Sequence, residues 1–150
     1  MIFETLATLS AGMFTGAAIY ISVVEHPSRM ECGTDLAIRQ FAPSYRRATV
    51  MQVSLAVIGF LSAAAAWYRT ASYWWLTGGV ILVAVIPFTL IVILRTNKKL
   101  LDPALDKTSA AATALLTRWG KLHAVRSILS LVSFLIFVIL LSHFRHSSTG

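Results

Sequence analysis

Hydrophobic residues form four long runs with little charge, and most of the polar residues lie between these runs. The runs cover approximately residues 3–24, 48–68, 74–94 and 124–143. Each run is close to the roughly 20 residues that an α-helix needs to cross the hydrocarbon core of a bilayer. The pattern therefore predicts an all-α protein with four transmembrane helices.

Two long polar connections and one very short turn join these runs. Helices joined in this way form an up-down-up-down four-helix bundle without crossing connections. The first long connection, residues 25–47, is expected to become helical after Gly33. Thr34 or Asp35 is the expected cap of that segment, and Pro43 is expected to limit its length.

The second long connection leads into the fourth helix. Asp102 followed by Pro103 is typical of an N-cap and a first helical residue, and strong helix formers fill the sequence that follows. We therefore expect the fourth helix to begin outside the membrane and to run inward through Trp119 and His123. The chain is predicted to form a single integral membrane domain over residues 1–150.

The composition supports a membrane protein and excludes some chemistry. Hydrophobic residues make up 57% of the chain and charged residues 13%, and the mean hydropathy is +0.73. An ordinary globular domain is about half apolar and a quarter charged. Cys32 is the only cysteine, so a disulfide within the chain and a C-x-x-C redox pair are both excluded. The first apolar run has no basic residue before it and no A-x-A-like site after it, which argues against a cleaved signal peptide.

The charge is distributed unevenly along the chain, which has a net charge of +7. Of the 13 lysines and arginines, only Arg69 and Arg145 lie on the side opposite the two long connections. This asymmetry predicts cytoplasmic long connections, a cytoplasmic extension of the fourth helix, and N- and C-termini outside. It also favours anionic membrane lipid over nucleic acid as the partner of the basic residues.

Three residues before the last apolar run are candidates for a functional site. Trp119, His123 and Arg126 are spaced i, i+4 and i+7, so they share one face of a helix. Trp119 serves either as an interfacial anchor, like Trp74 and Trp75 at the opposite surface, or as a pocket wall. Arg126 either snorkels to the interface or faces the protein interior. His123 is either a structural residue or a reactive one.

Residues from two other helices lie at the same level in an up-and-down bundle. His26 ends the first predicted span, and Asn97 ends the third. Thr89, Ile93 and Asn97 share one helical face at i, i+4 and i+8. Polar groups from three helices are therefore expected to meet in one pocket.

Two kinds of chemistry compete for this cluster. His26 and His123 could ligate a metal or both axial positions of a haem, although the chain offers no obvious third ligand beyond Glu25 and Cys32. Alternatively, a neutral histidine acts as a general base on an apolar substrate while Arg126 and Asn97 stabilise developing negative charge. The second interpretation uses more of the cluster, and it requires no metal.

The second half of the chain resembles the small membrane family known as domain of unknown function 1772, which includes the fungal anthrone oxygenases. The matching residues are Pro87, Phe88, Thr89, Thr96, Asn97, Leu100, Trp119, Leu122, His123, Arg126 and Ser127. The resemblance implies a pocket formed by Asn97, Trp119, His123 and Arg126. It also implies oxidation of an anthrone to an anthraquinone by molecular oxygen, with no established requirement for a metal, flavin or haem. Residues 23–29, VVEHPSR, are closer to a bacterial branch whose substrates are mostly unassigned.

The resemblance gives each candidate an expected role on a lipophilic aromatic or quinol-type substrate. His123 is the expected base, and Arg126 with Asn97 is expected to hold the enolate oxygen. The expected substrate-binding residues are Trp119, Phe88, Thr89 and His26. The alternative is a non-catalytic membrane module or partner subunit that binds lipid, quinone or another membrane protein. A G-x-x-x-G step at Gly12 and Gly16 serves contacts within one bundle or between chains, which leaves homo-oligomerisation open.

Overall fold

The computed structural model describes residues 1–147, with side chains for residues 1–143, and this part of the chain is helical apart from short connections. The segments are α1 (Ile2–Tyr20), the π-helical η1 (Ile21–Glu25), α2 (His26–Glu31), α3 (Thr34–Thr70), α4 (Tyr73–Val83), α5 (Val85–Phe88), the π-helical η2 (Thr89–Ile93), α6 (Leu94–Leu100) and α7 (Ala110–Ser147). They join into four helices that are long and apolar enough to cross a membrane. The predicted all-α fold with four spans is therefore confirmed.

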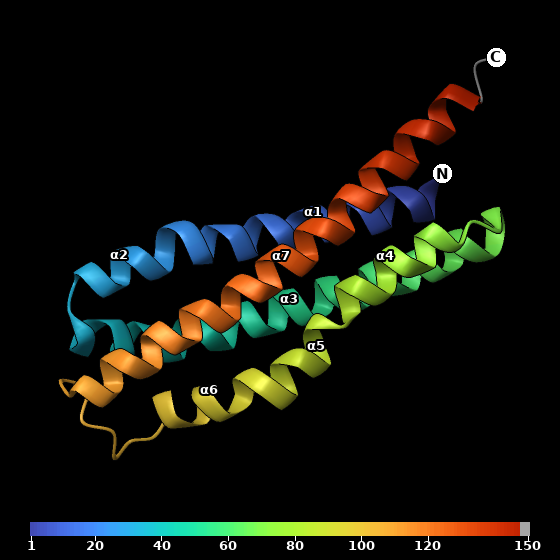
Figure 1. The fold of residues 1–150 in the computed structure, drawn as a ribbon. Helices are drawn as coiled ribbons and strands as arrows, with labels where there is room; N and C mark the ends of the chain where they lie inside the picture. The colour runs from blue at the N-terminus through green and yellow to red at the C-terminus, as the bar shows by residue number, and fades with distance from the viewer. Residues whose placement is uncertain (148–150) are drawn as a thin grey trace.

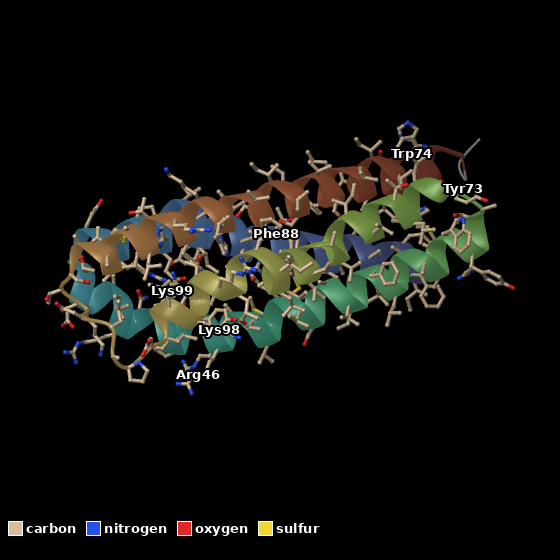
Figure 2. All side chains as sticks on the ribbon, turned by 60° about the horizontal axis from the view of Figure 1, so that its bottom comes forward. Arg46, Tyr73, Trp74, Phe88, Lys98 and Lys99 are labelled. Atoms are coloured by element: carbon tan, nitrogen blue, oxygen red, sulfur yellow. The ribbon has the colours of Figure 1, made fainter. Side chains whose placement is uncertain are left out.

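The four helices form an up-and-down bundle. The helix α1 packs against α3 and α7, and α4 packs against the same two helices (Figure 1). The N-terminus and the turn between α3 and α4 lie at one end of the bundle. Tyr73 and Trp74 lie at that end, whereas Arg46, Lys98 and Lys99 lie toward the other (Figure 2). Arg145, one of the two basic residues predicted on the side opposite the long connections, has a side chain outside the described residues.

Small residues allow the helices to approach closely. A Cβ atom on Gly78 would lie 2.5 Å from the ring of Phe137, and one on Gly12 would lie 2.9 Å from the ring of Phe134. Gly16 has nothing within 4 Å, so only the first glycine of the predicted G-x-x-x-G step makes a close contact. The hydroxyl of Ser133 adds a hydrogen bond between helices, to the carbonyl of Gly78 at 2.7 Å.

The first predicted loop is almost entirely helical. The first helix continues through Pro27 to Glu31, and α3 begins directly after Gly33, which has a φ of 90°. The prediction that Pro43 limits this segment was wrong, because α3 runs through it. Pro43 lies on the exposed side of the helix, where water can satisfy the carbonyl that lacks a donor. Neither Thr34 nor Asp35 caps the helix through its side chain.

The predicted start of the fourth helix was also wrong. Asp102 accepts a hydrogen bond from the backbone N–H of Ala104, and Asp106 accepts one from that of Thr108, each at 2.9 Å. These local bonds favour turns over helix. The backbone and hydroxyl bonds from Thr108 also lower the pKa of Asp106 below its usual value. The helix α7 begins at Ala110, still well before the last apolar run.

The third transmembrane helix bends between α4 and α5 (Figure 1). Pro87 has no backbone N–H to donate to the preceding turn, and Ala84 at the bend lies outside both helices. The π-helical segment η2 follows the proline. Such segments are frequent at functional sites.

The two tryptophans at the opposite end have different environments. Trp74 is 63% exposed, as an interfacial anchor requires. Trp75 is fully buried and stacks on Phe137 with 5.3 Å between ring centroids, so the prediction that it is an anchor was wrong. Adjacent residues point about 100° apart around an α-helix, so only Trp75 faces the bundle interior while Trp74 faces outward.

Candidate functional site

Two adjoining cavities lie between the helices, one near the middle of the bundle and one closer to its basic end. The inner cavity, of about 20 Å³, is lined by residues that include Ile21, Arg29, Phe41, Trp119 and His123. The outer cavity, of about 70 Å³, is lined by residues that include Phe14, Val53, Val85, Thr89 and Leu90. Four residues line both cavities: Tyr45, Thr49, Gln52 and Arg126.

Arg126 lies where the two cavities meet. Its Nη2 atom donates a hydrogen bond to Oε1 of Gln52 at 2.6 Å, and its guanidinium carbon lies 5.8 Å from the ring centre of Phe14. Its Nε atom and Nε2 of Gln52 have no hydrogen-bond partner. Within the described part of the chain, Arg126 forms no ion pair. A guanidinium within a membrane span that has no anionic partner can donate hydrogen bonds to an anionic oxygen of a bound molecule.

His123 is connected to the first helix through two serines. Its Nδ1 atom and the hydroxyl of Ser127 each lie 2.9 Å from Oγ of Ser22. Ser127 donates its hydroxyl proton to the carbonyl of Ala18 at 3.0 Å. The Ser127 hydroxyl also lies 3.4 Å from the carbonyl of His123. When Ser22 donates to Ser127, it accepts from Nδ1–H of His123, and Nε2 of His123 is then the basic nitrogen.

Trp119 is at the centre of a cluster of rings. Its centroid lies 4.8 Å from that of His123, 5.2 Å from that of His26 and 5.2 Å from that of Phe41. The guanidinium of Arg29 lies over the same indole at 5.8 Å. The structure therefore places Trp119 against both histidines, in a buried wall rather than at the surface.

Glycine at position 120 makes the position of His26 possible. A Cβ atom on Gly120 would lie 2.5 Å from Nε2 of His26. His26 is buried, and its Nδ1 atom has no hydrogen-bond partner. The imidazole thus lies directly over the backbone of α7.

A largely buried ion pair lies beside the inner cavity. Arg29 pairs with Glu25, and the Glu25 carboxylate also accepts a hydrogen bond from the hydroxyl of Ser44 at 2.7 Å. The side chain of Arg29 is 3% exposed. The pair therefore links the end of the first helix to α3 beside Trp119.

Comparison with known protein families identifies the chain. The family model described as anthrone oxygenase matches residues 41–136. The chain belongs to the anthrone oxygenase family. No curated protein and no solved structure matches the chain. For this family member, the matched range includes Gln52, Trp119, His123 and Arg126, whereas Ser22 and His26 lie before it.

The structure brings only part of the predicted site together in this anthrone oxygenase family member. Trp119, His123 and Arg126 line the inner cavity, and Thr89 lines the outer one. Asn97 is buried but lines neither cavity, and both polar atoms of its amide lack a hydrogen-bond partner. Phe88 lines neither cavity.

The π-helical segment explains why Thr89 and Asn97 do not face the same cavity. The predicted face of Thr89, Ile93 and Asn97 assumes regular α-helical spacing. One residue added by a π-helical turn rotates the following residues by about 100°. Ile93 and Asn97 are consequently buried together, whereas Thr89 is half-buried at the outer cavity.

Sequence reasoning missed Ser22, Tyr45 and Gln52. Gln52 had a detectable signal, because it is an amide near the start of an apolar run and buried amides require partners. Ser22 and Tyr45 had none, because serine and tyrosine are common near the ends of membrane helices. Only the packing of η1 and α3 against α7 brings these residues to His123 and Arg126.

The histidines do not form a recognisable metal cluster with other ligands. Within residues 1–143, no three His, Cys, Asp or Glu side chains are placed to hold one ion. Trp119 contacts both His26 and His123. A metal or haem bound by both imidazoles would have to share space with this indole.

Proposed function

We propose that the protein is a membrane oxygenase that oxidises a lipophilic aromatic or quinol-type substrate, such as an anthrone, with molecular oxygen. The observation that carries the proposal is that His123 and Arg126 line the same inner cavity, and that Arg126 forms no ion pair among the residues whose side chains are described. A base and an anion stabiliser in a dry site suit the chemistry of a weakly acidic carbon. Membership of the anthrone oxygenase family supports the same reaction class.

In the proposed reaction, Nε2 of His123 removes a proton from the benzylic carbon, and Arg126 holds the oxygen of the resulting enolate. The carbanion transfers one electron to dioxygen, and the radical pair combines to form a carbon–oxygen bond. The imidazolium returns its proton to the peroxide anion. Cleavage of the O–O bond with loss of the remaining hydrogen from that carbon gives a ketone and water. One anthrone and one dioxygen thus yield one anthraquinone and one water.

The neighbouring residues have supporting roles in this proposal. Trp119 provides an aromatic wall, and His26 supports the other side of that indole. Thr89 contributes to the outer cavity. Asn97 and Phe88 would reach a substrate only after a movement of the third helix. Gln52, which bonds to Arg126, takes the place beside the anion that was expected for Asn97.

The proposal includes no resident cofactor. It also places the basic end of the bundle in the cytoplasm and both termini outside, because basic residues concentrate at the cytoplasmic side of membrane proteins. Membrane lipid and an apolar aromatic molecule are the proposed partners, and no nucleic acid is involved. An absorption spectrum of the purified protein tests the cofactor statement. A Soret band would instead favour haem ligation by His26 or His123.

Oxygen consumption with emodin anthrone, corrected for autoxidation, tests the reaction. We expect His123→Ala to lower turnover by about a hundred- to ten-thousand-fold, the usual contribution of a general base. The control is His143→Ala, which removes an exposed histidine from the other end of α7. Unchanged turnover in His123→Ala would remove His123 from the mechanism. Folded wild-type protein with no rate above autoxidation would favour the non-catalytic binding role.

A further inference from the structure

The outer cavity connects the bundle interior to the apolar surface of the protein. At its inner end, Phe14 is fully buried and Arg126 borders the inner cavity. At its outer end, Val53 is 40% exposed and Leu90 is 59% exposed. The cavity therefore has a mouth between α3 and the segment from Val85 to Leu90.

The mouth lies between exposed apolar residues of two candidate membrane spans. Val53 and Leu90 both lie within uncharged runs that are long enough to cross a membrane. The nearby side chains of Val57 and Ile91 are also apolar and exposed. A polar molecule dissolved in water would have to cross this apolar surface to reach the mouth.

The bend in the third helix explains the opening. Before the bend, α4 packs closely on α3, and Cβ of Ala63 would lie 2.9 Å from a Cβ atom on Gly79. After Ala84, the helix changes direction because Pro87 cannot donate the usual hydrogen bond. Val85, Ile86 and Leu90 then border the outer cavity.

Besides Arg126 and Gln52, the polar residues that line the outer cavity are Tyr45, Thr49 and Thr89. The hydroxyl of Thr89 is already bonded to the carbonyl of Val85 at 2.7 Å. Arg126 and Gln52, in contrast, each have a nitrogen without a hydrogen-bond partner. A ligand in this cavity would meet apolar walls near the mouth and unsatisfied donors at the far end.

We propose that the outer cavity is a lateral portal, through which a flat, apolar molecule with one acidic oxygen enters from the bilayer and binds Arg126 through that oxygen. Arg126 and Gln52 line both this portal and the inner cavity, so their hydrogen bond must open before a ring bound in the portal reaches His123. The inference rests on the proposed function only in identifying this site with the substrate site. The portal itself is inferred from the cavity, its mouth and the unpaired donors of Arg126 and Gln52.

The outer cavity is too small to enclose a ring system. A closed apolar cavity that accepts benzene measures about 150 Å³, whereas the outer cavity measures about 70 Å³. A larger ring system would therefore occupy the cavity with part of its body in the mouth. The inner cavity, at about 20 Å³, has room for a water- or dioxygen-sized molecule.

Binding of emodin, an acidic trihydroxyanthraquinone, to the full-length protein in phosphatidylcholine nanodiscs tests the portal. The variants Val53→Trp and Leu90→Trp place a bulky side chain in the mouth. Val57→Trp and Ile91→Trp are matched controls, because these exposed residues lie on the same helices but do not line the cavity. The trimethyl ether of emodin, which lacks the acidic hydroxyls, tests the role of the charged oxygen.

We expect each mouth variant to raise the Kd of emodin by about tenfold or more, and each control to leave it within about twofold. We also expect the trimethyl ether to bind the wild-type protein more weakly than emodin does. Equal affinities for the mouth and control variants, no preference for emodin over its ether, or no saturable binding to the wild type would each overturn the portal.

This binding assay separates the portal from the proposed reaction because it requires no turnover. Portal-dependent binding without anthrone oxidation would keep the portal and reject the oxygenase. His123-dependent oxidation with the same Kd and KM in all four tryptophan variants would keep the oxygenase and reject the portal.

Discussion

Oγ of Ser22 lies 2.9 Å from Nδ1 of His123 and joins the π-helical segment of the first transmembrane helix to the fourth. The same oxygen contacts Ser127, so a single hydroxyl bridges His123 and Ser127. This relationship gives Ser22 a role that its position in the sequence does not suggest. It positions and orients His123 rather than contacting the substrate itself.

Removal of this hydroxyl is expected to impair His123 without unfolding the protein. In Ser22→Ala, Nδ1 loses its partner and the tautomer with a basic Nε2 is no longer favoured. Turnover of emodin anthrone should fall about three- to tenfold, as the loss of roughly one hydrogen bond predicts. Ser22→Thr keeps the hydroxyl and should restore most of the rate. Equal rates in Ser22→Ala and wild type would show that the serine is only a packing residue.

Substitution of Gly120 is expected to disturb the ring cluster. In Gly120→Ala the new methyl group would collide with Nε2 of His26 at 2.5 Å. Such overpacking costs about 1–3 kcal/mol of stability, so the midpoint of thermal unfolding in detergent should fall. Gly16→Ala is the control, since nothing lies within 4 Å of its added atom. That variant should unfold at the same or a higher temperature, because alanine favours helix over glycine. An equal decrease in both variants would contradict the contact with His26.

Loss of the buried ion pair is expected to cost more than loss of an exposed one. Arg29→Gln leaves the partly buried Glu25 carboxylate without its charged partner, which typically costs about 3–5 kcal/mol. Arg39→Gln removes the same kind of i, i+4 pair, but its two side chains are 63% and 45% exposed. That change should cost less than about 1 kcal/mol. Thermal unfolding in detergent measures both, and similar decreases would argue against burial as the cause.

The serine contact between α7 and α4 should contribute measurably to packing. Ser133→Ala removes the hydrogen bond to the carbonyl of Gly78, and we expect a loss of about 1 kcal/mol. Ser54→Ala changes an exposed serine on α3 and should have little effect. The same unfolding assay compares them. A Ser133→Ala protein as stable as the wild type would mean that the Gly78 carbonyl is satisfied without this donor.

The sequence by itself determined the number of membrane helices, their order and the face shared by Trp119, His123 and Arg126. These features follow from local quantities: the length of an apolar run and the spacing of residues on one helix. The tertiary structure decided the rest of the site. It brings Ser22 and Gln52 to this face, and it turns Thr89 and Asn97 toward different surroundings.

The same distinction explains the incorrect predictions. Pro43 was expected to limit a helix because proline lacks a donor, yet its exposed position makes that loss tolerable. Trp75 was expected at the membrane surface, but the interior of the bundle accepts its ring against Phe137. In each case, the residue type sets an energetic cost or preference. Only the arrangement of neighbouring helices determines whether the residue contacts water or another side chain.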